Sequence, residues 1–185
     1  MHNGEVLGFL LAVSGLAAWL MPFLWAKRGA GRLAAVDLRA RWGLVLEVLA
    51  LALMLWGRFW IVTNFSWRVL ASVIFFLLAA LLSWSSTKAL GSHLRFDAAI
   101  GMDHALVRSG PYRLIRHPIY CSMLCLLWGI GSLAAPAWLF ILATLLFVAG
   151  TEIRVRIEDR LLARRFGDSF VRYKHATRAY LPLLR

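Results

Sequence analysis

The sequence predicts an all-α, polytopic membrane protein with about five transmembrane helices, the last two of which form a tight helical hairpin. Of the 185 residues, 61% are hydrophobic and only 16% are charged, whereas a soluble domain has about 45–50% apolar and roughly 25% charged residues. The apolar residues gather in long runs, and the basic residues lie between those runs. These observations exclude a disordered chain and a disulfide-stapled secreted module, and they argue strongly against a soluble globular enzyme.

Four apolar runs account for the predicted helices, at about residues 6–25, 43–60, 67–84 and 119–153. The fourth run is too long for one span of roughly 20 residues. Gly129, Gly131 and Pro136 interrupt it, so we expect two helices joined by a very short turn. Helices in such a hairpin run antiparallel, which returns the chain to the membrane face from which it started.

The basic residues predict the orientation in the membrane. Five of the 21 lie in 27–41, five in 85–118 and nine from 154 onward, which leaves only Arg58 and Arg68 elsewhere. Five spans place the three basic segments on one side, and the positive-inside rule makes that side cytoplasmic, with the N-terminus outside. The net charge of +12 is therefore explained by orientation and by contact with anionic lipid, with no nucleic-acid partner.

We expect one integral membrane domain over residues 1–185. Its parts are three N-terminal spans (1–84), a cytoplasmic cofactor-binding segment (85–118), the helical hairpin (119–153) and a cytoplasmic C-terminal segment (154–185). Two details remain open within the spans. Glu47 is a functional candidate because a carboxylate in a membrane is costly, or it simply reaches the interface. Cys121 and Cys125 lie one helical turn apart, and that spacing alone does not predict a metal site.

The residues best suited to chemistry lie in the two segments that flank the hairpin. Gly110 and Pro111 predict a turn, and Pro118 suits the first turn of a helix. His117 and Tyr120 would then lie at a helix N-terminus, which favours an anion. On the last helix, Arg154 and Glu158 share a face, although such pairs are usually ordinary surface contacts.

Several short elements together carry a resemblance to a known family. They are His104-Ala105-Leu106-Val107, Ser109-Gly110-Pro111-Tyr112, Arg116-His117-Pro118-Ile119-Tyr120, Glu158-Asp159, Phe166-Gly167, Tyr173 and Leu181-Pro182. With them, the second half of the chain resembles the isoprenylcysteine carboxyl methyltransferases and their phospholipid methyltransferase relatives. Two positions depart from the family pattern. Asp159 replaces the second glutamate of an acidic pair, and Ser122 stands where many members carry glycine.

The resemblance implies an enzyme that uses S-adenosyl-L-methionine and releases S-adenosyl-L-homocysteine. The positions that would line the cofactor pocket are His104, Ala105, Leu106, Val107, Tyr112, His117, Pro118, Ile119, Tyr120 and Glu158. Arg154 would face the carboxylate of the substrate, and Arg116 would support the site by orienting Glu158. No metal site is expected. The acceptor would be lipophilic or lipidated and would reach the site sideways from the bilayer, in contact with membrane lipid.

We therefore expect carboxyl O-methylation of an isoprenylcysteine-like or other lipid-like acceptor, because an arginine has the wrong charge to face an amine. N-methylation of phospholipid head groups is the nearest alternative. An NADPH-dependent sterol-type membrane reductase is another, since such enzymes resemble this family in their final helices. A non-enzymatic membrane scaffold or transporter subunit would explain the spans and charges but would leave the motifs as coincidence.

Overall fold

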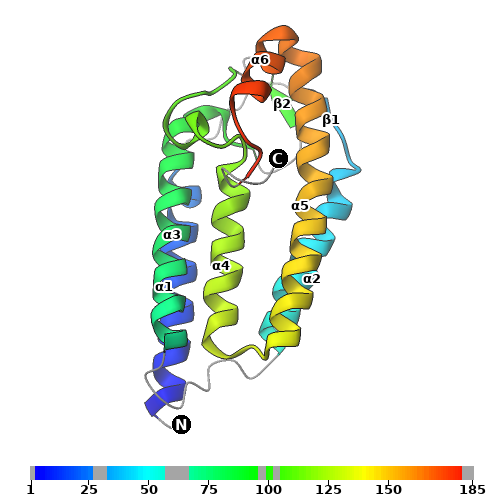
Figure 1. Cartoon of the computed structure of the whole chain (residues 1–185). Helices are drawn as coiled ribbons and strands as arrows, with labels where there is room; N and C mark the ends of the chain where they lie inside the picture. Colours follow the sequence, from blue (N-terminus) through cyan, green and yellow to red (C-terminus); the bar gives the residue numbers. More distant parts are fainter. Residues whose placement is uncertain (1–2, 27–32, 57–66, 96–98, 102–104, 181–185) are drawn as a thin grey trace.

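The computed structural model describes residues 3–26, 33–56, 67–95, 99–101 and 105–180. The helices and strands in this part of the chain are α1 (Asn3–Trp25), β1 (Leu33–Val36), α2 (Ala40–Trp56), α3 (Trp67–Leu90), β2 (Ala99–Gly101), α4 (Pro118–Ala134), α5 (Ala137–Phe166) and α6 (Asp168–Ala176). Two short 3₁₀ helices, η1 (Gly91–His93) and η2 (Gly110–Arg113), precede α4. Figure 1 shows the long helices side by side, with α6 and the two strands at one end of the bundle.

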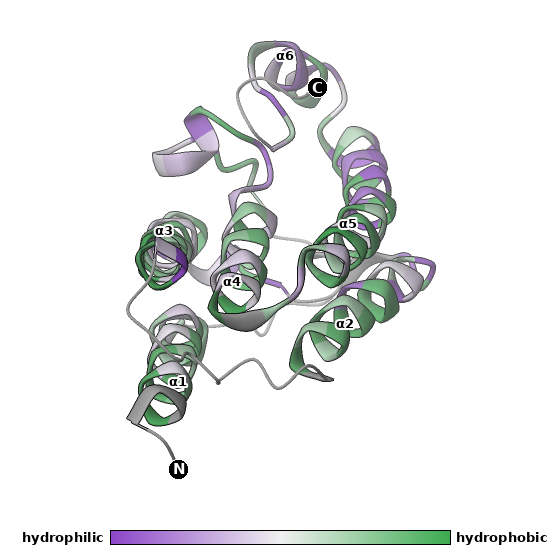
Figure 2. Ribbon diagram, turned by 60° about the horizontal axis from the view of Figure 1, so that its bottom comes forward, coloured by the Kyte–Doolittle hydropathy of each residue, from purple (hydrophilic) through white to green (hydrophobic). Residues whose placement is uncertain are grey.

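The described helices confirm a helical membrane fold. In Figure 1, α1, α3 and α5 run in one direction along the bundle, and α2 and α4 run in the other. Three stretches of the described chain are long and apolar enough to cross a membrane, namely Val6–Trp25, Trp67–His93 and Ala137–Phe166. The helices α2 and α4 have 17 residues each and are therefore about 26 Å long. Hydrophobic residues make up most of the long helices (Figure 2), and many of their large apolar side chains are exposed.

The predicted turn between the last two helices is confirmed, since only Ala135 and Pro136 join α4 to α5. The two helices nevertheless diverge after this turn. The helix α4 packs mainly on α3, whereas α5 packs mainly on α2. The hydroxyl of Ser72 in α3 donates a hydrogen bond to the carbonyl of Gly129 in α4 at 2.8 Å, which helps to hold that pair together. The helix α5 also continues to Phe166, well beyond the predicted end at residue 153.

Two glycines allow α2 and α5 to approach each other closely. A Cβ atom on Gly43 would lie 2.4 Å from the carbonyl oxygen of Gly150, and one on Gly150 would lie 2.5 Å from that of Gly43. Small residues of this kind let the backbones of membrane helices come into contact. The contact brings the next turns of α2 and α5 within reach of each other, and these turns carry Glu47, Thr151 and Arg154.

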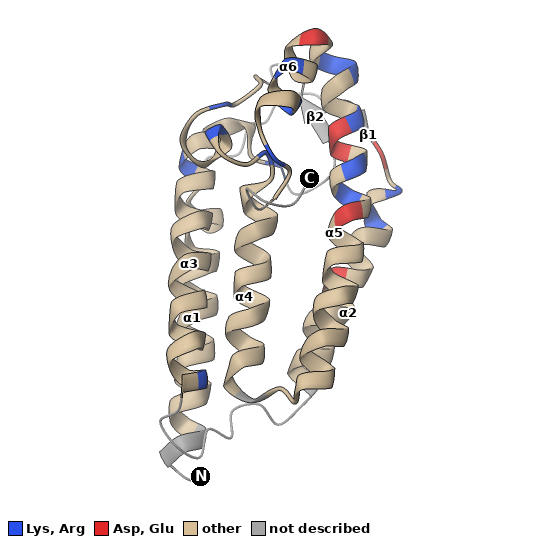
Figure 3. Ribbon diagram, viewed as in Figure 1, with Lys and Arg blue, Asp and Glu red and all other residues tan. Residues whose placement is uncertain are grey.

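Charged residues gather at the end of the bundle that carries α6 and the strands (Figure 3). There β1 pairs antiparallel with β2, with Val36 opposite Ala99 and Leu33 opposite Gly101. This short ladder was not predicted from the sequence, and it joins two of the three predicted basic segments. The third basic segment begins at residue 154, within α5, and its described part lies at the same end of the bundle. The charged site residues described below therefore lie at one end of an otherwise apolar bundle.

We expect Gly150→Val to force α2 away from α5 and to lower the free energy of unfolding by about 1–3 kcal/mol, the usual cost of overpacking. Ala149→Val is the matched control, because Ala149 is exposed on the same helix. Thermal unfolding of both variants in detergent measures the difference. Equal unfolding temperatures would contradict a tight α2–α5 contact.

Candidate functional site

The loop before α4 is shaped by the predicted turn. Gly110 has a φ of +59°, a left-handed conformation that glycine adopts without strain. Together with Pro111 it starts η2, which buries the side chain of Tyr112. The hydroxyl of Tyr173 in α6 donates a hydrogen bond to the carbonyl of Tyr112 at 2.6 Å. The loop is thereby attached to α6.

The segment after α6 is a second support for this loop. The amide of Arg116 donates to the carbonyl of Arg178 at 2.7 Å, and the amide of His117 donates to that of Ala179 at 3.0 Å. Ile115 and Arg178 form a parallel bridge. No feature of the sequence predicted these backbone contacts. They place His117 directly before α4, where Pro118 occupies the first turn as predicted.

Asp159 of α5 is the centre of a buried ionic cluster. Its side chain lies 3.0 Å from Nε2 of His117, 3.5 Å from Nη2 of Arg116 and 3.2 Å from Nζ of Lys174. Arg116 also donates to the carbonyls of Lys174 and Thr177. The predicted pairing of Arg116 with Glu158 is therefore wrong, because this arginine binds Asp159 and the end of α6 instead.

The ring of His117 is buried among these groups and beside Glu158, whose Oε2 lies 3.5 Å from Nδ1. Burial alone lowers the pKa of His117, but the hydrogen bonds to Asp159 and Glu158 outweigh it, and the pKa is raised above its usual 6.5. The protonated ring can donate from both nitrogens, one to each carboxylate. His117 thus connects the start of α4 to two consecutive residues of α5.

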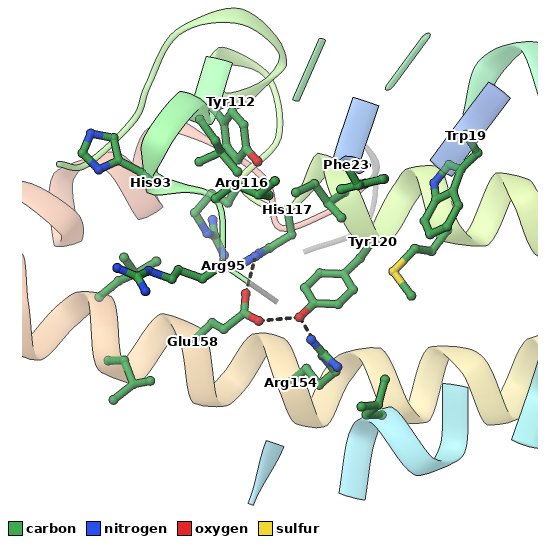
Figure 4. A pocket seen from close by; sticks show the side chains of 17 residues that line it. Trp19, Phe23, His93, Arg95, Tyr112, Arg116, His117, Tyr120, Arg154 and Glu158 are labelled. Carbon is green, nitrogen blue, oxygen red and sulfur yellow. Dashed lines mark hydrogen bonds and ion pairs between the residues drawn. The ribbon is translucent and has the colours of Figure 1, made fainter. Parts of the chain in front are cut away.

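One turn further into the bundle, Tyr120 links Arg154 to Glu158. Its hydroxyl donates to Oε1 of Glu158 and accepts a hydrogen bond from Nε of Arg154 at 2.8 Å. The guanidinium carbon also lies 5.3 Å from the centre of the Tyr120 ring. All three were predicted from the sequence as site residues, and Figure 4 shows that their side chains point toward one another.

A cavity of about 330 Å³ opens between these side chains. Figure 4 shows His93, Arg95 and Arg116 toward one end of it and Trp19 toward the other. Its walls come from α1 to α5 and from the loop before α4. The lining residues are Trp19, Phe23, Leu44, Leu90, His93, Leu94, Arg95, Tyr112, Arg116, His117, Ile119, Tyr120, Met123, Arg154, Glu158, Leu161 and Leu162.

Seven of the predicted site residues line this cavity, namely Tyr112, Arg116, His117, Ile119, Tyr120, Arg154 and Glu158. Pro118 is buried within α4. The described residues Ala105, Leu106 and Val107 precede η2 and are not part of the lining. His104 lies outside the described residues. The first two spans supply Trp19, Phe23 and Leu44, which the sequence could not single out because they resemble any lipid-facing or core residue.

A metal centre receives no support from the described part of the chain, where no three His, Cys, Asp or Glu side chains are placed to hold an ion. Both cysteines are free thiols. The site is instead a set of paired charges and two tyrosines around a largely apolar cavity. Such a combination suits an amphipathic ligand, with polar groups to orient it and apolar walls to exclude water.

Fold and site together define a helical membrane protein with a cavity at one end that apolar and paired charged side chains line. Comparison with known families identifies it more closely. Residues 67–169 match the family described as phospholipid methyltransferase, and the match includes α3, the loop before α4, α4 and α5. The chain belongs to this family.

Two curated proteins are similar to part of the chain. The cobalt-zinc-cadmium resistance protein CzcN of Cupriavidus metallidurans is 37% identical over 83 residues, which are 44% of this chain and 38% of that protein. The nickel-cobalt-cadmium resistance protein NccN of Alcaligenes xylosoxydans xylosoxydans is 34% identical over 79 residues, 43% of this chain and 37% of that protein. The similarity thus spans little more than a third of each relative.

We expect Asp159→Asn to destabilise the protein by about 3–5 kcal/mol, because removal of one partner leaves buried cations uncompensated. Asp37→Asn is a control, since it breaks an exposed pair with Arg39 and should leave the unfolding temperature unchanged. Chemical or thermal unfolding in detergent measures both. A small effect of Asp159→Asn would show that the cluster does not hold α4 to α5.

The raised pKa of His117 also predicts a pH dependence of stability. A group with a raised pKa stabilises the folded state fully below its unfolded pKa, here 6.5, and this contribution is lost as the pH rises through the folded value. The unfolding temperature should therefore fall as the pH increases from 6.5, and His117→Gln should flatten the profile. An unfolding temperature that increases with pH in the wild type would contradict a charged His117.

Proposed function

We propose that the protein is an S-adenosylmethionine-dependent membrane methyltransferase that methylates the carboxylate of a lipid-like acceptor, such as an isoprenylcysteine. The observation that carries this proposal is the arrangement of Tyr120 between Arg154 and Glu158 at one cavity. An anion-binding and a cation-binding side chain thus lie next to each other at the end of an apolar bundle. Membership of the phospholipid methyltransferase family supports methyl transfer as the reaction.

The residues of the cavity fit S-adenosylmethionine. Its volume of about 330 Å³ is at the lower end of the roughly 300–1,000 Å³ that is typical of ligand pockets. The carboxylate of Glu158 would bind the cationic amino group of the cofactor, and His117, Ile119 and Tyr112 would enclose the rest. When bound, the cofactor would supply an electrophilic methyl group on its sulfonium sulfur. The carbon–sulfur bond would break as the new carbon–oxygen bond forms, and the sulfur would keep the electron pair as a neutral thioether.

The chain's own residues have mainly to bind, align and exclude water. A carboxylate is already a nucleophile, so this transfer requires no strong general base. Arg154 would hold the acceptor carboxylate, and the hydrogen bond from its Nε to Tyr120 would fix the guanidinium plane beside Glu158. Alignment of two bound reactants can lower the activation free energy by about 7–11 kcal/mol.

The acceptor would approach from the bilayer. Trp19 and Phe23 of α1 and Leu44 of α2 form apolar walls of the cavity, and they fit a hydrocarbon tail. By the positive-inside rule, the basic segments favour a cytoplasmic location for the charged end of the bundle, with the N-terminus outside. The water-soluble cofactor would then reach the cavity from the cytoplasm.

Phospholipid N-methylation is the second candidate, and the description of the matching family favours it. Arg154 argues against it, because a guanidinium at the acceptor side repels a protonated amine. A sterol-type reductase would require a nicotinamide cofactor, and the family match gives it no support. A scaffold without activity would leave the alignment of Tyr120, Arg154 and Glu158 without a purpose.

Purified protein in detergent, incubated with methyl-labelled S-adenosylmethionine, distinguishes these candidates. N-acetyl-S-farnesylcysteine and phosphatidylethanolamine vesicles serve as acceptors, and mass spectrometry identifies the products. We expect a methyl ester of the farnesylcysteine, which mild alkali hydrolyses. Methylated phosphatidylethanolamine, whose N-methyl label mild alkali does not release, would favour the second candidate. Binding of NADPH without binding of S-adenosylhomocysteine would refute methyl transfer.

We expect Arg154→Ala to reduce methylation by about 10²-fold or more, the effect of removing one partner of a buried charge pair. The same variant should bind S-adenosylhomocysteine with wild-type affinity, as measured by calorimetry. Glu158→Gln, in contrast, should weaken the affinity for S-adenosylhomocysteine. Equal losses of both properties in Arg154→Ala would refute this division of roles.

A further inference from the structure

Glu47 is a charged residue of the second span that the proposed reaction does not use. Its side chain is 3% exposed, so it does not reach the interface, which was one interpretation of the sequence. The hydroxyl of Thr151 donates to its Oε1 at 3.0 Å. Its Oε2 lies 3.7 Å from Nη1 of Arg154 and receives no hydrogen bond from any described residue.

This position depends on the close contact of α2 with α5. Glu47 is one turn beyond Gly43, and Thr151 and Arg154 follow Gly150 on the facing helix. A buried carboxylate in an apolar bundle is costly unless a cation compensates it. Here the compensating cation is Arg154, which is also mostly buried. The two charges therefore stabilise each other across the α2–α5 interface.

Two of the contacts of Arg154 lie on different sides of it. Its Nε faces Tyr120 of α4, and its Nη1 faces Glu47 of α2. Arg154 and Glu158 are four residues apart on α5, a spacing at which opposite charges attract each other along a helix. In a medium of low dielectric constant this attraction is stronger than at a surface. A direct pair of Arg154 with Glu158 would neutralise the carboxylate that is proposed to bind the cofactor.

The geometry points to Glu47 as a positioning residue, a counter-ion in the membrane that holds Arg154 toward α2 and keeps the charge of Glu158 for the cofactor. This inference rests on the proposed function. Glu47 acts through Arg154 and touches neither reactant. This role explains why the carboxylate of Glu47 lies among apolar side chains, with one oxygen directed at the guanidinium of Arg154.

The test measures the affinity of the detergent-solubilised protein for S-adenosylhomocysteine, so it does not depend on the identity of the acceptor. Glu47→Gln preserves the shape of the side chain but removes its charge. It should weaken this affinity about tenfold, within the range measured for coupled neighbouring charges. Ser72→Ala is the control, because it removes a buried polar group from the α3–α4 interface and should leave the affinity unchanged.

The decisive variant is the double substitution Glu47→Gln with Arg154→Ala. If Glu47 acts by restraining Arg154, removal of both residues returns the affinity to within about twofold of the wild type, because the two effects are coupled. A purely structural role of Glu47 predicts no such recovery. Thr151→Val, which removes the hydrogen bond to Oε1, should weaken the affinity in the same direction by a smaller factor and serves if Glu47→Gln does not fold.

The outcomes separate this inference from the proposed function. A wild-type protein that does not bind S-adenosylhomocysteine overturns both. A wild-type protein that binds it, with unchanged affinity in Glu47→Gln and Thr151→Val, overturns the role of Glu47 alone. An affinity that remains low in the double variant also overturns that role.

Discussion

The buried carboxylate of Asp159 is the constraint on which the rest of the site depends. A charge so enclosed is stable only when cations surround it, and the three that do so come from two separate places along the chain. Arg116 and His117 precede α4, and Lys174 lies in α6. The need to compensate one carboxylate therefore gathers the loop, the start of α4 and the C-terminal helix around a single turn of α5.

The cavity results from the divergence of α4 and α5. A hairpin with a two-residue connection would fill its own interior if its helices packed along their full length. Instead α3 holds α4, and the glycine contact holds α5 against α2. The space between them is bridged at the charged end by Tyr120, Arg154 and Glu158. Side chains of α1 and α2 complete its apolar walls, so the N-terminal spans are part of the site.

Much of this arrangement could be predicted because membrane helices and turns have strong local signals. Apolar runs marked the long helices, and Pro118 marked the start of α4. The meeting of Tyr120 with Glu158 followed from the short turn of the hairpin. By contrast, the partner of Arg116 was mispredicted, since two adjacent carboxylates on α5 differ only in the direction they face. The location of Glu47 was equally hidden, because it depends on which helix packs against α2.

The central claim is that the loop before α4 and the charged half of α5 bind one ligand together. Hydrogen exchange of the detergent-solubilised protein, with and without S-adenosylhomocysteine, tests it most directly. We expect the ligand to slow exchange in both 105–120 and 154–180. The parts of the helices that lie away from the charged end of the bundle should exchange as before. Protection of only one of these segments, or of neither, would contradict a shared cavity.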